Sequence, residues 1–313
     1  KQTLWGGERI IPYKELASGL SRVGESWELS GMPGSESVVA EGPWAGSTLS
    51  ELIGRFGAEL LGKANYARFG QEFPLLVKFI DAREDLSIQV HPDDELARKR
   101  HGKSGKCEMW YVLEAEPGAS LLTGFSRPIA PAEYERRVAD NTLTDVLNRQ
   151  AIASGDVFYL PAGRVHSIGK GSFIVEIQQS SDITYRIYDF DRRDAAGNSR
   201  ELHTELAREA IDFESSENSR ITYAPENNQE VRLVTTPYFT TSLYTLTART
   251  RCDWSATDSF VAIVLLQGSG SLTDNEGNRI DVRQGETWLL PASTQWTEIT
   301  PHTAPLRLLT SRI

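Results

Sequence analysis

Short runs of branched and aromatic residues recur along most of the chain and alternate with turn-forming residues. Gly, Pro and Asp separate these runs at the close spacing that is typical of β-sandwiches and β-barrels. The pattern therefore predicts a mainly β protein. The predicted strands are residues 75–80, 86–91, 108–113, 156–160, 173–178, 231–234, 241–247, 260–266 and 287–290.

A helical pattern interrupts these strands at several places. Residues 47–60 begin with a Ser that suits the N-cap position, and Leu49, Leu52 and Phe56 then fall on one side of a helix. We interpret such stretches as helical inserts in a β fold. The other predicted helices are residues 93–101, 131–148 and 202–213.

The stretch 214–229 (ESSENSRITYAPENNQ) is polar and rich in turn-forming residues. It follows the last predicted helix and separates it from the strands of the C-terminal part. We therefore place the domain boundary here. The prediction is a longer β domain with helical inserts over residues 1–220 and a smaller β domain over residues 221–313.

One unit of sequence occurs twice. Residues 155–166 (GDVFYLPAGRVH) and 285–296 (GETWLLPASTQW) share a Gly-acid start, a short strand and a Leu-Pro-Ala turn, but the first ends at His166 and the second at Trp296. Upstream, a strand, a Gly turn and a strand also recur in both copies. The repeat predicts paired β-barrels. Because the second copy has apolar residues where the first has Glu108 and His166, we expect it to be structural.

Composition and charge narrow the class of protein. With 313 residues and 39% hydrophobic residues, the chain can bury a core in each domain. The formal net charge of −10 argues against a nucleic-acid or anionic-membrane partner, because phosphate backbones attract clustered Lys and Arg. The longest apolar run, 260–266, is far shorter than the roughly 20 residues of a membrane span.

Two further features bear on the cellular compartment. The stretch KQTLWGGERI has no basic-then-apolar signal pattern, so we expect a cytoplasmic protein. Cys107 and Cys252 are too few for a disulfide framework, and we interpret both as small buried side chains.

Candidate chemistry gathers in the first copy of the repeat. Strand alternation puts Ser87, Gln89 and His91 on one face, which must either meet solvent or line a polar cavity. Glu108 begins the next strand, and His166 follows the Leu-Pro-Ala turn. Two imidazoles, a carboxylate and an amide oxygen suit a divalent ion and leave positions open for water or substrate.

The other histidines and the acidic pair after His91 receive simpler interpretations. His101 lies in the basic stretch 98–106 (RKRHGKSGK), which could attract phosphate or form a solvated helix end, and we favour the solvated helix end for all of it except Lys106. His203 begins a predicted helix and is expected to cap it or to pack. Asp93 and Asp94 are expected at a helix N-terminus, where the helix dipole favours negative charge.

Four segments together resemble the type I mannose-6-phosphate isomerases, in particular the short bacterial form without the large helical insertion. The combination of QVHPDD with a downstream GKxExWYVL is specific. The resemblance covers most of residues 1–215, including WGG at 5–7 and GESWELS at 24–30, and thins to the level of fold beyond. The segments are FPLLVKFIDAREDLSIQVHPDDELA, GKCEMWYVLEAEPGA, LPAGRVHSIGKG and SSDITYRIYDFDR.

The resemblance implies a mainly β fold of two cupin (jelly-roll) barrels with a few helical inserts, the second barrel being degenerate. It also implies one metal site per chain, usually zinc, with other divalent ions left open. Its ligands would be Gln89, His91, Glu108 and His166. Cys107 departs from the Thr that is more usual at this position.

Further site residues follow from the same resemblance. It implies that Arg186, in SDITYR, is the catalytic arginine, and that Lys106 and Ser87 lie near the substrate phosphate or sugar hydroxyls, with Lys106 also in a catalytic role. Glu176 is an acid-base candidate. Its strand allows its side chain to face either the cavity or solvent, and the spacing from His166 is looser than elsewhere.

The implied function is the metal-dependent interconversion of mannose 6-phosphate and fructose 6-phosphate through an enediol. A sugar phosphate is the only partner that we expect. Two alternatives stay open at this point. One is a non-catalytic double cupin that binds a sugar phosphate, and the other is a metal-dependent cupin oxygenase, which would need Fe(II) and consume oxygen. Lys106 and Arg186 beside a complete ligand set argue against the non-catalytic binder.

Overall fold

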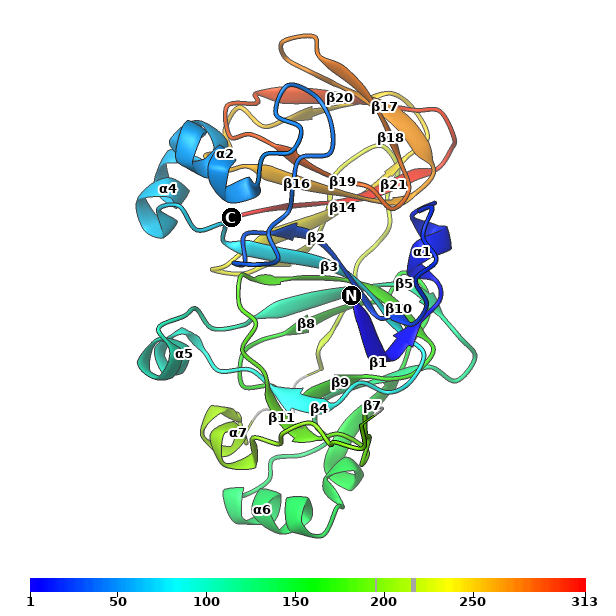
Figure 1. Cartoon of the computed structure of the whole chain (residues 1–313). Coiled ribbons are helices and arrows are strands. Elements are labelled where there is room, and N and C mark those ends of the chain that lie inside the picture. Colours follow the sequence, from blue (N-terminus) through cyan, green and yellow to red (C-terminus); the bar gives the residue numbers. More distant parts are fainter. Residues whose placement is uncertain (195, 215–217) are drawn as a thin grey trace. The chain divides into compact units, whose positions relative to one another are not determined.

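The computed structural model describes residues 1–194, 196–214 and 218–313, and it is mainly β, as predicted (Figure 1). Residues 215–217 of the expected boundary stretch lie outside the described residues. The chain divides into two compact units. Unit 1 consists of Lys1–Ile11, Ser18–Ser26 and Lys78–Ile221, and unit 2 of Pro12–Ala17, Trp27–Val77 and Thr222–Ile313.

Unit 1 contains most of the first barrel and several short helices. Its strands are β1 (Gln2–Gly7), β4 (Ile88–Val90), β5 (Glu108–Ala115), β6 (Ser120–Phe125), β7 (Leu147–Ala151), β8 (Val157–Leu160), β9 (His166–Ile168), β10 (Ser172–Gln179), β11 (Tyr185–Tyr188) and β12 (Arg220–Ile221). Its helices are α5 (Asp94–His101), α6 (Pro131–Ala139), the 3-10 helix η1 (Leu143–Val146) and α7 (Thr204–Ala210).

Three elements run across the boundary between the units, and the remaining elements belong to unit 2. The elements that cross are α1 (Ile10–Tyr13), β2 (Glu25–Ser30) and β3 (Leu75–Ala82). The helices of unit 2 are α2 (Leu49–Phe56), α3 (Ala58–Leu61) and α4 (Lys63–Phe69). Its strands are β13 (Val231–Thr235), β14 (Thr240–Leu246), β15 (Thr250–Asp253), β16 (Val261–Gln267), β17 (Ser269–Asp274), β18 (Arg279–Arg283), β19 (Thr287–Leu290), β20 (Trp296–Pro301) and β21 (Leu306–Arg312).

Two antiparallel sheets build the first barrel. One has the order β1-β3-β10-β5-β8-β12 and the other the order β11-β4-β9-β6-β7. Trp110 and Phe158 from the first sheet share a buried cluster with Leu121 and Ile168 from the second. The inner faces of the two sheets therefore pack against each other, as in a jelly roll.

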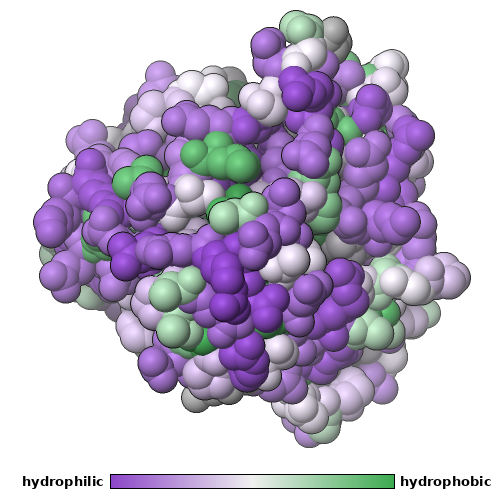
Figure 2. Space-filling view, turned by 90° about the horizontal axis from the view of Figure 1, so that it is seen from below, coloured by the Kyte–Doolittle hydropathy of each residue, from purple (hydrophilic) through white to green (hydrophobic). Residues whose placement is uncertain are grey.

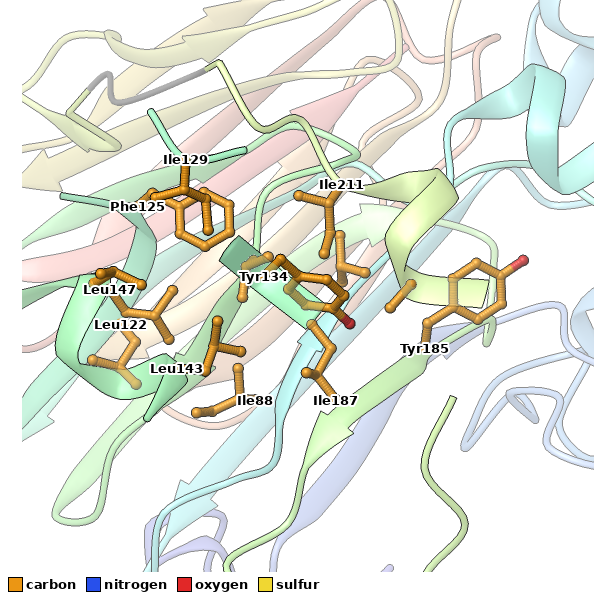
Figure 3. Packing of buried hydrophobic residues seen from close by; sticks show 14 of the residues in the cluster. Ile88, Leu122, Phe125, Ile129, Tyr134, Leu143, Leu147, Tyr185, Ile187 and Ile211 are labelled. Carbon is orange, nitrogen blue, oxygen red and sulfur yellow. The ribbon is translucent and has the colours of Figure 1, made fainter. Parts of the chain in front are cut away.

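The outer face of the second sheet is covered by helices. Ile88 of β4 and Ile187 of β11 lie in a buried cluster with Tyr134 of α6 and Ala207 of α7 (Figure 3). The apolar side of β4 thus faces the helices. This leaves the opposite, polar side of β4 facing the barrel interior.

The second barrel repeats the plan of the first. Its sheets have the orders β13-β14-β21-β16-β19 and β15-β20-β17-β18. The strand register also repeats, because Glu108 pairs with Leu160 between β5 and β8, and Val261 pairs with Leu290 between β16 and β19. The predicted paired barrels with helical inserts are confirmed.

Unit 2 includes residues 27–77, a stretch that the sequence pattern placed within 1–220. Contacts that are distant in sequence account for this. The carboxylate of Asp258 accepts the main-chain N–H groups of Lys63 and Ala64 at the start of α4, at 2.7 and 3.0 Å. Phe73 packs on Phe260 with ring centroids 4.8 Å apart.

Two predicted helices differ in detail. The N-cap of α2 is Thr48, whose side chain forms a capping box with Glu51, and not the preceding Ser. The helix predicted over 131–148 ends at Ala139, and Asn141 then takes the left-handed conformation with φ of 55°. A short 3-10 helix and a strand follow, because a continuous α-helix cannot pass through such a residue.

The helices and one face of the molecule (Figure 2) bear on whether the chain has long apolar segments or apolar patches. Among the described residues, no helix combines the length and the apolar composition that a membrane crossing requires. Figure 2 shows a face on which hydrophilic residues predominate and hydrophobic ones form small scattered groups. Isolated hydrophobic residues of this kind are normal on protein surfaces.

Candidate metal and substrate site

The polar face of β4 leads into a buried cluster of side chains. Gln89 pairs with His166 of β9 across the strands, so both side chains lie on the same face. Glu108 begins β5 in the opposite sheet, and His91 follows β4. His91, Glu108 and His166 are all buried, with 2% of their surface exposed or less.

The ligand atoms of these side chains converge. His166 Nε2 lies 3.1 Å from Glu108 Oε1, and His91 Nε2 lies 3.6 Å from Glu108 Oε2. Gln89 Nε2 approaches His166 Nε2 at 3.3 Å. The ligand atoms of His91, Glu108 and His166 lie within 4.8 Å of one another. The structure thus brings together the ligand atoms of three predicted metal ligands, and it places the amide of the fourth, Gln89, beside His166.

Main-chain carbonyls orient both imidazoles. His91 Nδ1 donates to the carbonyl of Ile183 at 2.7 Å, and His166 Nδ1 donates to the carbonyl of Arg164 at 2.8 Å. With the proton on Nδ1, each ring presents the lone pair of Nε2 to the cluster. Histidines that bind metal ions are usually held in this way.

Electrostatics favour the protonation states that a cation requires. Burial lowers the pKa of His91 well below its usual value, and the charge of Lys106 adds to this, so the ring is neutral. Burial alone would raise the pKa of Glu108, but Lys106, His166 and His91 outweigh it and hold this pKa well below its ordinary range. The cluster therefore offers a carboxylate beside a neutral imidazole.

The carboxylate oxygens of Glu108 are buried without hydrogen-bond partners among the described residues. Within the described part of the chain, neither of its buried oxygens accepts a hydrogen bond of good geometry, although nitrogen atoms lie close by. Buried polar atoms without partners are rare and costly, and a bound cation removes this cost. The donor set of two imidazoles, a carboxylate and an amide fits a divalent metal ion.

Lys106 and Ser87 lie beside this cluster. Lys106 Nζ is 3.2 Å from both His91 Nε2 and Glu108 Oε2, and the lysine is buried. Ser87 Oγ donates to Gln89 Oε1 at 3.2 Å. Both residues thus lie beside the candidate metal ligands.

Glu176 faces the interior of the first barrel and not solvent. Its side chain is buried, and it accepts hydrogen bonds from Lys78 Nζ at 2.8 Å and from Trp110 Nε1 at 3.1 Å. Trp110 in turn packs edge-on against His166, with ring centroids 5.4 Å apart. Glu176 is therefore connected to the cluster through one aromatic side chain.

Lys78 is a functional candidate that the sequence analysis missed. It is buried, and its Nζ also donates to Gln178 Oε1 at 2.8 Å. Burial lowers its pKa, but Glu176, together with Glu25 and Glu108, raises it, so the net pKa lies above the ordinary value and the lysine is charged. The available signal was a single lysine in the apolar run 75–80, on the same strand face as the buried Ile80.

Arg186 stands on β11, directly across from Gln89. Its Nη1 donates to the carbonyl of Glu201 at 3.0 Å. Its Nε is buried and has no hydrogen-bond partner in residues 1–194, 196–214 and 218–313. Burial lowers the pKa of Arg186, and the positive charge of Arg200 adds to this, but a guanidinium stays charged in proteins.

His101 is the exposed last residue of α5, as predicted, and its Nε2 lies 2.8 Å from the hydroxyl of Tyr185. His203 stands at the N-cap position of α7 but makes no side-chain cap there. Of its two expected roles, packing fits, since its ring centroid lies 6.4 Å from that of Tyr185. Asp93 caps α5 as predicted and accepts the N–H of Leu96 at 2.8 Å.

Comparison with known proteins identifies the family. The family model "Phosphomannose isomerase type I, catalytic domain" matches residues 5–122. The mannose-6-phosphate isomerase of Streptococcus mutans is 34% identical over 291 residues, which cover 92% of this chain and 89% of that protein. The chain belongs to the type I phosphomannose isomerases.

Other phosphomannose isomerases are similar to this chain in sequence and structure over most or all of its length. ManA of Bacillus subtilis, a mannose-6-phosphate isomerase, is 34% identical over 295 residues, which cover 93% of this chain and 90% of that protein. The crystal structure of the mannose 6-phosphate isomerase from Bacillus subtilis superposes with a TM-score of 0.89 at 30% identity, covering 100% of this chain and 97% of that one. The predicted fold of two cupin barrels, with the second degenerate, is thereby confirmed.

Proposed function

We propose that this phosphomannose isomerase interconverts mannose 6-phosphate and fructose 6-phosphate in a metal-dependent reaction through an enediol. The observation that carries the proposal is the buried convergence of His91, Glu108 and His166 with Lys106 beside them. Relatives that match this chain over most of its length bear the name of this activity.

The metal would be held by Gln89, His91, Glu108 and His166, and we propose one zinc ion per chain. The ligand atoms of His91, Glu108 and His166 lie close enough together to share one ion. When bound, a divalent ion supplies a Lewis acid that polarises neighbouring oxygen atoms of the sugar. Nitrogen and carboxylate ligands suit zinc.

The reaction moves a proton from C2 of the aldose to C1, while a second proton passes from the C2 hydroxyl to the carbonyl oxygen. We assign the transfer between carbons to Glu176. Lys78 Nζ and Trp110 Nε1 each donate to its carboxylate, so it is held in one orientation in a buried setting. A general base held in this way can take up and return the same proton.

Arg186, Lys106 and Ser87 are proposed to bind the substrate. The free, buried Nε of Arg186 and its planar guanidinium suit the phosphate or the enediolate oxygens. The ammonium of Lys106 can stabilise negative charge that develops beside the metal ligands, and it is also proposed as catalytic. The hydroxyl of Ser87 can bond a sugar hydroxyl or the phosphate.

The alternatives are weaker on the same observations. A cupin oxygenase would need a redox-active metal and oxygen, whereas the family to which this chain belongs is one of isomerases. A non-catalytic binder would not need the ion pair of Lys78 and Glu176 inside the barrel. Isomerisation is the function that uses every group of the site.

We also propose that the enzyme acts in the cytoplasm on a small soluble substrate. Cys107 and Cys252 are buried free thiols, as expected for a reducing compartment.

A coupled isomerase assay on metal-stripped and zinc-restored protein tests the function. We expect activity to disappear with the metal and to return with one equivalent of zinc. Oxygen consumption is recorded in parallel and should stay at background. Restored metal without isomerase activity would contradict the proposal.

A further inference from the structure

Arg186 lies on an edge strand of the first barrel. β11 is the outermost strand of its sheet, with β4 as its neighbour on one side. The main-chain N–H and C=O of Arg186 bond on the other, outer side. Main-chain groups on an open sheet edge need partners from outside the ladder, because an unpaired buried group is costly.

His203 supplies both partners. Its main-chain N–H donates to the carbonyl of Arg186 at 2.6 Å, and its ring Nδ1 accepts the N–H of Arg186 at 3.2 Å. A single residue thus takes the place of a neighbouring strand at this position. The ring of His203 makes no cap hydrogen bond to α7. Its Nδ1 instead accepts from the main chain of Arg186.

The same loop also holds the side chain of Arg186. The carbonyl of Glu201 accepts from Arg186 Nη1 at 3.0 Å, two residues before His203. The carboxylate of Glu201 lies 3.8 Å from His203 Nε2. Because Nδ1 accepts a hydrogen bond, the proton of the neutral ring is on Nε2, toward Glu201.

Both elements that carry this contact are anchored in one core. Tyr185 and Ile187 of β11 lie in the same buried cluster as Ala207 and Ile211 at the end of α7. Figure 3 shows Tyr185 at the side of this cluster, next to the ribbon of α7. The residues that flank Arg186 therefore face the core, and strand alternation turns Arg186 to the opposite side, toward Gln89.

We propose that His203 is a positioning residue for Arg186. It fixes the main chain of the edge strand so that the guanidinium stays at the substrate site. This rests on the proposed role of Arg186 in isomerisation. The acceptor Nδ1 is the part of His203 that the proposal requires, since the main-chain N–H is present whatever the side chain.

The substitution His203→Ala removes Nδ1 and keeps the main-chain N–H. We expect kcat/KM to fall about tenfold or more, because misplacing a binding group by about 1 Å can cost as much as 100-fold. The loss should fall on the same constant, kcat or KM, as in Arg186→Ala. The exposed His302 gives a matched histidine control, and His302→Ala should keep wild-type activity.

Conservative variants separate positioning from folding. The Oδ1 of Asn can take the place of Nδ1, so His203→Asn should restore most of the activity. In His203→Gln the amide lies one bond further out, near the place of Nε2, and activity should stay low. Equal activities of the Asn and Gln variants, both measured on protein with wild-type circular dichroism, would overturn the proposal.

A double variant tests whether His203 acts through Arg186. In the Arg186→Ala background, adding His203→Ala should cause no further loss. Losses that multiply would show an independent role and overturn the proposal. An active wild type with an unchanged His203→Ala variant overturns the positioning role alone, whereas a wild type without isomerase activity overturns the proposed function as well.

Discussion

In the first barrel Glu108 pairs with Leu160, and in the second barrel Val261 pairs with Leu290 at the same register. The neighbouring sheet repeats the correspondence. Gln89 pairs with His166 between β4 and β9, and Asp253 pairs with Trp296 between β15 and β20. The two barrels therefore share their backbone plan, and they differ in the side chains that this plan places at the positions of the candidate metal ligands.

The same fold can therefore hold a polar cluster in one barrel and an apolar core in the other. Burying polar groups is costly unless each finds a partner. In the first barrel Glu108 and His166 contact each other, and a bound cation would offset the rest of the cost of burying them. In the second barrel, Val261 and Leu290 belong to a continuous apolar core, which stabilises the fold without any ion. Substitutions at matched positions can test this contrast.

Glu108→Gln should have the largest effect. It removes the negative charge of the ligand set while keeping the size of the side chain. We expect the bound metal to fall from one per chain to near zero and kcat/KM to fall about 1000-fold or more, since a metal ion supplies several kcal/mol to such reactions. Metal analysis and the coupled assay check this. A variant that keeps both metal and activity would remove Glu108 from the site.

Lys78→Met should have the next largest effect, on stability. Glu176 would keep its burial but lose the ion pair, and breaking such a pair typically costs about 3–5 kcal/mol. The free energy of unfolding in urea measures this. The double variant with Glu176→Gln should recover part of the loss. A loss below about 1 kcal/mol would show that the pair is not as buried as described.

A substitution at Thr310, which matches Glu176 in the second barrel, should raise the stability instead of lowering it. Thr310 pairs with Ile263 as Glu176 pairs with Trp110. Its Oγ1 is buried and has no hydrogen-bond partner among the residues that the structure describes. Thr310→Val should therefore raise the unfolding free energy by up to about 1 kcal/mol. A loss of that size would reveal a partner for the hydroxyl.

Trp296→His should leave the metal content unchanged. It gives the second barrel the histidine of the first, but Val261 still occupies the place of Glu108. Asp253, which pairs with Trp296, is exposed and accepts the N–H of Ser255 at 2.9 Å, so no buried carboxylate supplies the charge that a divalent ion needs. Mass spectrometry under native conditions counts the ions, and two per chain would contradict this prediction.

Much of the site could be predicted because strand alternation is strict. A period of two residues puts Ser87, Gln89 and His91 on one face, and a shift of one residue would reverse it. The repeat then located Glu108 and His166. Lys78 was missed because one polar residue in an apolar run does not show its partner, Glu176, which lies 98 residues further along the chain.

The sequence predicted the class of the fold, but not which residues belong to each of the two units. Gly, Pro and branched residues marked the strands. No local pattern could show that the start of α4 is capped by Asp258, nearly two hundred residues away, and so belongs to unit 2. Likewise, the role of His203 depends on a contact with Arg186 across an open sheet edge, which the sequence near His203 does not encode.

Anomalous diffraction at the zinc edge, from crystals of the zinc-loaded protein, tests the central claim most directly. We expect one peak per chain, within bonding distance of His91 Nε2, Glu108 and His166 Nε2, and no peak in the second barrel. A chain without a peak at these three residues, or with its ion bound elsewhere, would contradict the proposed metal site.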